Sequence, residues 1–324
     1  MPSVTTTSEQ LRSSDDAAPA GAGPASARSG FRLTRRQLRA ALGVLWVIAA
    51  CLQFQPFMFS KGLALEIVAP EAAGQPPIVT GPVGLFVRAV SSHPAAFNWV
   101  FAPAELGIGV ALLLVSRHRA ARWVSGVGVA MALGIWWLGE SMGGLLTGSA
   151  AGSMGAPGAA LLYAVIGLAA WPTRADDDRP ARWLPAAWFV IWGGTAALSA
   201  LPAATTPDGL AGQVLMGSTM SPGFLARPEY AFAERISRVS AGTALLVAAV
   251  VVAVQVMIAI GGLLTGRLRT VAAALALAFA ALTWMLCQGF GGITTGEATD
   301  VATAPLLALL TAALMSTSGV RRIR

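Results

Sequence analysis

Apolar residues run along most of this chain in tracts of about 20, separated by short polar segments. A helix needs about 20 mostly apolar residues to cross roughly 30 Å of hydrocarbon. The tracts lack the alternation of a membrane β-strand, and a helix satisfies its own backbone groups in lipid. The pattern predicts eight spanning helices, at about 40–59, 97–116, 123–145, 154–172, 186–203, 239–264, 270–290 and 303–319.

Composition agrees with this pattern. The 324 residues are 55% hydrophobic and only 11% charged, whereas about a quarter of the residues in soluble domains are charged. We therefore expect an all-α integral membrane protein whose main partner is the lipid bilayer.

Positive charge is distributed unevenly between the two sides of the predicted membrane. Of the 22 Lys and Arg residues, 17 lie on the side that holds both chain ends and three short loops. Lys and Arg concentrate in cytoplasmic loops, so both termini are predicted to be cytoplasmic, in a multi-pass protein of the plasma (inner) membrane. The net charge of +7 thus follows the topology and does not indicate a nucleic-acid partner.

The chain is predicted to divide at the ends of its apolar tracts. Residues 1–37 are rich in Ser, Ala, Gly, Pro and Thr, too poor in bulky apolar groups to form a core, and are expected to be a disordered cytoplasmic tail. The remaining predicted segments are a four-helix membrane repeat at 38–172, a cytoplasmic linker at 173–185, a second repeat at 186–319 and a basic tail at 320–324.

A duplication underlies the two predicted repeats. The stretch WWLGESMGGLLTG at 136–148 pairs without a gap with WMLCQGFGGITTG at 284–296, and the same shift pairs Pro157 with Pro305. Each repeat has an even number of spans, so the two are predicted to be parallel, related by an axis along the membrane normal. The shared small residues are predicted to allow close helix packing and a short outer turn: Gly143, Gly144, Thr147, Gly148, Gly291, Gly292, Thr295 and Gly296.

Two acidic residues, Glu105 and Glu140, lie within the predicted spans. An ionisable group at that depth is costly unless it is paired, neutralised or facing water. One interpretation is that both are protonated and hydrogen-bond across helices. The other is a ligand or proton site near the outer leaflet, for which the candidate residues are Glu105, Glu140, Gln53, His93, Trp136 and Gln288.

The stretch APAELGIGVALLLVSRHRAARWVSGVGVA at 102–130 resembles the DoxX-like family of four-helix membrane proteins. In this resemblance Glu105, Gly107 and Gly109 correspond to the family's Glu and glycine positions, and the second repeat has Ala253 or a neighbour where Glu105 would fall. The resemblance implies a tandem duplication of the DoxX-like unit. It also implies a subunit that supports a membrane redox or quinone-linked assembly, with a redox protein or quinone as partner.

The sequence contains few other residues or motifs that indicate catalysis or metal binding. The chain contains no Walker, HExxH, GxSxG or CxxCH motif, which favours a non-enzymatic role with no required cofactor and no metal site. Cys51 and Cys287 lack metal or redox spacing and are expected to be buried structural thiols. Three functions remain open: a DoxX-like subunit that binds a small lipophilic molecule or partner, a small-solute or proton transporter, and a membrane scaffold without a ligand.

Overall fold

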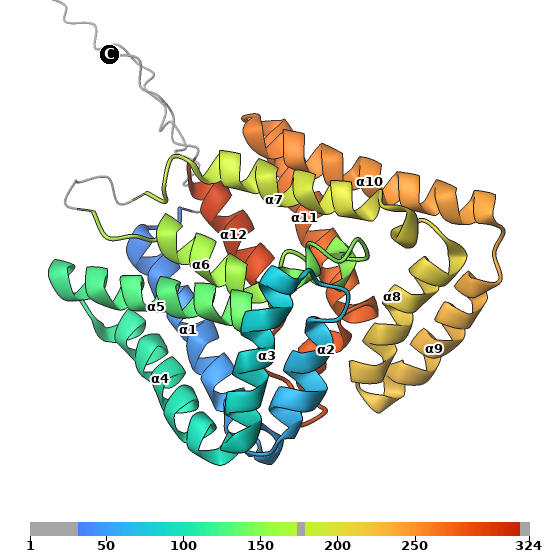
Figure 1. Ribbon diagram of the computed structural model, residues 1–324. Helices are drawn as coiled ribbons and strands as arrows, with labels where there is room; N and C mark the ends of the chain where they lie inside the picture. Colours follow the sequence, from blue (N-terminus) through green and yellow to red (C-terminus); the bar gives the residue numbers. More distant parts are fainter. Residues whose placement is uncertain (1–31, 174–178, 318–324) are drawn as a thin grey trace, which may run out of the picture. The chain divides into compact units, whose positions relative to one another are not determined.

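A computed structural model describes residues 32–173 and 179–317, all within one compact unit that begins at Arg32. Over these residues the fold is all-helical, without a strand, as the sequence predicted (Figure 1). The predicted basic tail and most of the predicted N-terminal tail lie outside the described residues.

A helix occupies each of the eight predicted positions. Their bounds are α1 Arg35–Gln53, α4 Pro94–Leu114, α5 His118–Leu138, α6 Ala159–Ala169, α7 Leu184–Ser199, α10 Ala241–Leu263, α11 Arg267–Leu286 and α12 Thr303–Thr317. Of the described helices, α4, α5, α10 and α11 are long and apolar enough to cross a membrane, while α6, α7 and α12 are apolar but shorter. These helices fit a multi-pass membrane protein.

The short helix α6 shows why the apolar tracts overestimate helix length. Its predicted span begins near residue 154, but Gly155 and Gly158 each have a φ of +106° and Pro157 lies between them, so the helix begins only at Ala159. Eleven residues at 1.5 Å each reach about 16 Å, roughly half of the hydrocarbon thickness. The helix α12 likewise begins after a residue of positive φ, Ala302 at +60°.

Two stretches that the sequence pattern leaves outside the predicted spans, after the first and the fifth of them, are helical. Residues 60–96 contain a π-helical turn at Leu63–Val68, α2 (Ala69–Glu71) and α3 (Pro77–Ser92), and residues 204–238 contain α8 (Pro207–Met220) and α9 (Gly223–Ser237). The helices α8 and α9 pack against each other. These segments were missed because a search for tracts of spanning length passes over shorter, more polar helices.

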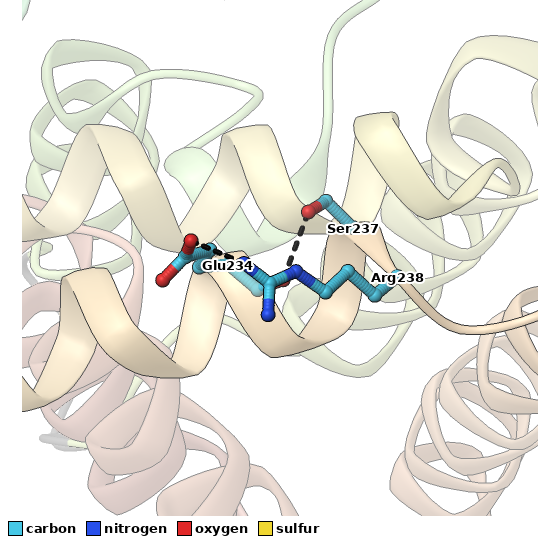
Figure 2. Close-up of polar contacts among 3 residues, drawn as sticks. All are labelled: Glu234, Ser237 and Arg238. Carbon is cyan, nitrogen blue, oxygen red and sulfur yellow. Dashed lines mark hydrogen bonds and ion pairs between the residues drawn. The ribbon is translucent and has the colours of Figure 1, made fainter.

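Helix α9 ends at an exposed polar cluster (Figure 2). Arg238 forms an ion pair with Glu234, and the Ser237 hydroxyl donates a 2.9 Å hydrogen bond to the Glu234 carbonyl. Both charged side chains are more than half exposed, and such surface pairs contribute about 0–1 kcal/mol. This cluster stabilises the end of a helix and is not part of a buried site.

Helix pairing follows the same order in both halves of the chain. The helix α1 packs on α4 and α5 on α6, while α7 packs on α10 and α11 on α12. The short helices α6 and α12 contact each other, and the main core is formed around them (Figure 1). Its largest fully buried side chains include Trp188, Trp192, Leu162, Ile166 and Leu310.

The two cysteines differ in their surroundings. Cys287, at the end of α11, is buried as expected, but Cys51 is exposed on the surface of α1. The expectation was therefore wrong for Cys51, because that residue lies on the face of α1 that no other described helix covers.

Candidate functional site

Glu140 caps the first turn of a neighbouring helix. It lies two residues beyond the end of α5, in the turn that leads to Ser141–Gly144. Its Oε1 accepts a hydrogen bond of 2.9 Å from the Ala160 backbone N–H, at the start of α6. The first N–H groups of a helix have no partner within the helix, and those of α6 lie in the protein interior. The carboxyl group therefore replaces water as their acceptor.

The chain before α6 is shaped around this carboxyl group. Trp136, one helical turn before Glu140, donates its indole N–H to the Pro157 carbonyl at 2.7 Å. A side chain at Gly158 would place its Cβ 2.2 Å from Glu140 Oε2, and the φ of +106° strongly favours glycine there. A Cβ at Gly143 would lie 2.2 Å from the Pro157 oxygen. Glycine is thus required at two positions for the turn to close over the start of α6.

The second half repeats this arrangement with an amide. Gln288 Oε1 accepts from the Thr303 hydroxyl at 3.1 Å and from its backbone N–H at 3.3 Å, at the start of α12. Trp284 donates its indole N–H to the Val301 carbonyl at 3.0 Å. The amide nitrogen of Gln288 also donates to the Ser153 carbonyl at 3.1 Å, so both of its polar atoms have partners.

These contacts correct one detail of the sequence pairing. The residue that matches Pro157 is Val301, since each accepts the tryptophan N–H and precedes a residue of positive φ. The gapless pairing of Pro157 with Pro305 is therefore wrong. The segment between the turn and the last helix is four residues shorter in the second half.

Glu105 is a buried acid in the middle of α4, with 3% of its surface exposed. Its Oε2 has no hydrogen-bond partner among the described residues. The burial pattern of α4 recurs in α10 at a shift of 150 residues. The matching buried positions are Glu105 and Gln255, Ile108 and Ile258, and Gly109 and Ala259. The counterpart of Glu105 is therefore Gln255 and not Ala253, which is exposed.

Two further residues, Asp300 and Tyr163, join the two glutamates. Asp300 lies just before α12 and accepts a 2.7 Å hydrogen bond from the Ala302 N–H. Its carboxyl group interacts electrostatically with Glu105 and Glu140, and all three acids interact with the Tyr163 hydroxyl of α6. We call Glu105, Glu140, Tyr163 and Asp300 the acid cluster.

Gln53 anchors the segment before α12 against the first half. Its amide nitrogen, at the end of α1, donates to the Thr299 carbonyl at 3.3 Å. Asn98 of α4 in turn donates to the Gln53 carbonyl at 2.6 Å. These two bonds hold Asp300, which follows Thr299, beside the helices that carry the glutamates.

Two acids outside the spanning helices, Glu140 and Asp300, have pKa values above the ordinary range. Glu140 is half-buried, but its Oε2 is shielded from solvent and has no partner among the described residues. Burial raises the pKa of Glu140 to about 8, with a further increase from the Asp300 carboxyl, although the hydrogen bond from Ala160 acts in the opposite direction. Burial also raises the pKa of Asp300. Near neutral pH, the Glu140 carboxyl group therefore holds a proton.

The six candidate residues from the sequence do not form one site. Glu105 and Glu140 share the acid cluster, Trp136 supports the Glu140 turn, and Gln53 fixes the segment that carries Asp300. Gln288 belongs to the matching turn of the second half. His93 is exposed between α3 and α4, and no contact among the described residues connects it to the acid cluster.

The conserved spacing of small residues serves turns more than helix packing. The six glycines that the two stretches share, Gly143, Gly144, Gly148, Gly291, Gly292 and Gly296, all have positive φ, between +63° and +84°. Thr147 and Thr295 each donate a 2.8 Å hydrogen bond to the carbonyl of the glycine three residues earlier. The expected short outer turn is present at Thr147 and Gly148. Gly143 and Gly144, expected to allow close helix packing, also lie in a turn, because α5 ends before them at Leu138.

Sequence reasoning missed Tyr163 and Asp300. Tyr163 is one of only two tyrosines in the chain and lies within an apolar tract, which was an available signal. Asp300 lies in a segment that read as a loop, and only the fold brings it to Glu105 and Glu140. Comparison of the chain with protein-family models, with curated proteins and with solved structures gives no match.

Proposed function

We propose that this chain is a membrane protein of two parallel four-helix repeats with a proton-binding acid cluster, of which Glu105, Glu140 and Tyr163 come from the first repeat and Asp300 from the second. In this proposal it is a DoxX-like subunit of a redox or quinone-linked assembly in the plasma membrane. All eight apolar helices cross or enter the bilayer, both termini are cytoplasmic, and the cluster lies toward the outer leaflet. Quinone reduction takes up protons and quinol oxidation releases them, so such an assembly has a use for a protein group that holds protons.

One observation carries the proposal: acids stand where the equivalent positions of the second half have amides. Glu105 corresponds to Gln255, and Glu140 corresponds to Gln288. Each amide has nearly the shape of its acid and cannot titrate near neutral pH. The first half therefore differs from the second in its capacity to bind protons, while its backbone arrangement is alike.

The structural role of Glu140 does not account for its charge. Gln288 caps α12 by accepting from the Thr303 N–H with its side-chain oxygen, as Glu140 caps α6 by accepting from the Ala160 N–H. A glutamine at 140 would cap α6 equally well and would avoid the cost of burying an ionisable group. Retention of acids at two such positions supports a role in which they gain and lose protons.

The test is a titration of the buried carboxyl groups. Infrared spectra of the protein reconstituted in lipid should contain a carboxylic-acid band that decreases as pH rises through neutrality. Glu140→Gln should remove part of this band and the double variant E105Q/E140Q more of it, with the helical signal unchanged. Gln288→Glu serves as the matched control in the second half and should add a band. An absence of any titrating carboxylic-acid band in the folded protein would refute the proposal.

The redox assignment has a separate test. Mass spectrometry of protein purified in mild detergent should identify a quinone or a membrane redox protein that co-purifies, in smaller amounts with E105Q/E140Q. If equal amounts of the quinone or redox protein co-purify with the wild type and with E105Q/E140Q, the acid cluster does not bind that partner. The redox assignment then fails, and the second candidate function remains.

That second candidate is a proton or small-solute transporter, which the presence of three neighbouring acids among apolar helices also favours. A pH-sensitive dye trapped in proteoliposomes would report net proton movement. Proton movement that depends on Glu105 and Glu140, in vesicles without any redox partner, would support transport. Vesicles that show no net proton movement would argue against it.

A further inference from the structure

A hollow lies next to the acid cluster on the side of the first residues of α1. Its volume is about 10 Å³, room for a single water molecule, and its lining includes Arg39, Trp46, Leu112, Ser125, Gly128 and Tyr163. Tyr163 therefore takes part in two environments, because it lines this hollow and also interacts with Glu105, Glu140 and Asp300. It is the residue through which the two environments meet.

Two buried hydroxyl groups in the hollow lack partners. Ser125 is 3% exposed and Tyr163 is 4% exposed, and neither side-chain oxygen has a hydrogen-bond partner among the described residues. Leaving a buried hydroxyl unpaired is costly because the group has lost its hydrogen bonds to bulk water. A site lined by such groups, with room for a water molecule, is the kind in which buried water is found.

The second half provides an internal comparison. The buried positions of α5 and α11 match at a shift of 148 residues, which pairs Ser125 with Ala273. Counting from Pro157 and Val301, Tyr163 pairs with Leu307. Both hydroxyl groups are therefore absent from the half that has Gln255 and Gln288 in place of the two glutamates. The two hydroxyl groups and the two glutamates thus occur together in the first half.

We propose that Ser125 and Tyr163, with water in the hollow, form a proton path between the Arg39 end of α1 and the acid cluster. This inference rests on the proposed function, and it names the side from which the cluster exchanges protons. By the predicted topology, that side is the cytoplasm.

Each step moves one proton between two oxygens, without any change in redox state. The Tyr163 hydroxyl donates its proton to a carboxylate of the cluster and receives another from water in the hollow. Ser125 can both donate and accept, so it orders that water and passes the next proton inward. In this path the proton passes along neutral hydroxyl groups and neutral water.

Hydrogen–deuterium exchange of the carboxylic-acid infrared band tests the path. After transfer to deuterated buffer, the band should shift at least tenfold more slowly in Tyr163→Phe than in the wild type, and more slowly in Ser125→Ala as well. Tyr163→Phe keeps the aromatic ring, which lies 4.8 Å from that of Trp46, and folding is checked by melting. Thr311→Val, which removes a buried hydroxyl from α12, is the matched control and should exchange at the wild-type rate.

The outcomes separate this inference from the proposed function. A titrating band with wild-type exchange rates in both hydroxyl variants would overturn the path and leave the acid cluster intact. A protein without a titrating band would overturn both. Slower exchange in Thr311→Val to the same degree would show a general effect on helix opening, and it would also overturn the path.

Discussion

Replacement of Glu140 by Gln should make the stability of the protein less dependent on pH. The pKa of Glu140 is raised from 4.5 to about 8, first by burial and then by the carboxyl groups of Asp300 and Glu71. Between these two values the folded state binds more protons at this site than the unfolded state. The free energy of unfolding therefore falls as pH rises through this window. The stabilisation that Glu140 gives by binding its proton is fully present only below about pH 4.5.

The size of this effect follows from the shift. One pKa unit corresponds to about 1.4 kcal/mol, so the full shift sets an upper bound of about 5 kcal/mol. Glu140 is only half-buried, and water that reaches the ionised form reduces the penalty. We expect the wild type to lose about 2 kcal/mol between pH 5 and pH 9 relative to Glu140→Gln.

Denaturant unfolding in detergent at several pH values measures this difference. The two proteins should have similar stability at pH 5, because Gln accepts the Ala160 hydrogen bond as the protonated acid does. At pH 9 the variant should be the more stable one. Parallel pH profiles for the two proteins would refute the reasoning, because they would show that Glu140 has the same proton affinity in the folded and unfolded states.

Three further predictions concern the turn and the topology. Gly158→Ala should lower the free energy of unfolding by about 2–4 kcal/mol, through backbone strain and loss of the α6 cap. The control Gly134→Ala, on the open surface of α5, should be neutral or stabilising by up to about 1 kcal/mol. Equal melting temperatures for the two variants would contradict this prediction. Trp284→Phe should lower the free energy of unfolding by about 1–3 kcal/mol, because the Val301 carbonyl loses its hydrogen-bond donor. A variant as stable as the wild type would show that water takes the place of the indole N–H. In a background without native cysteines, a thiol at Ala73 should react with an impermeant reagent from outside and one at Ala120 should not; the reverse result would show that the arginine count predicts the wrong orientation.

The sequence predicts helix positions well because spanning length and apolarity are local properties. It predicts helix ends poorly, as α6 shows, since the apolar tract continues through Gly155, Pro157 and Gly158 while the backbone cannot remain helical there. Local composition carries the signal for where a helix lies, whereas φ values and cap contacts decide where it begins.

The acid cluster was only half predictable for a different reason. Glu105 and Glu140 stand out because charge is rare in apolar tracts, but Asp300 comes from the far half of the chain. Its position depends on the hydrogen bond from Gln53 to the Thr299 carbonyl, which no repeat or periodicity encodes. A contact between halves can be found only once both are folded together.

The similar contacts of the two halves separate what the fold requires from what the first half adds. The starts of α6 and α12 are both buried, and each needs an oxygen acceptor from the turn before it, which Glu140 and Gln288 supply. That need explains why a polar residue occupies this position in both halves and explains nothing about charge. At the second position, Glu105 and Gln255 are both deeply buried, and neither has all of its polar atoms paired among the described residues. Since an amide is tolerated at both positions of the second half, the acids of the first half impose a cost that the fold does not demand, and proton binding is the property that distinguishes them.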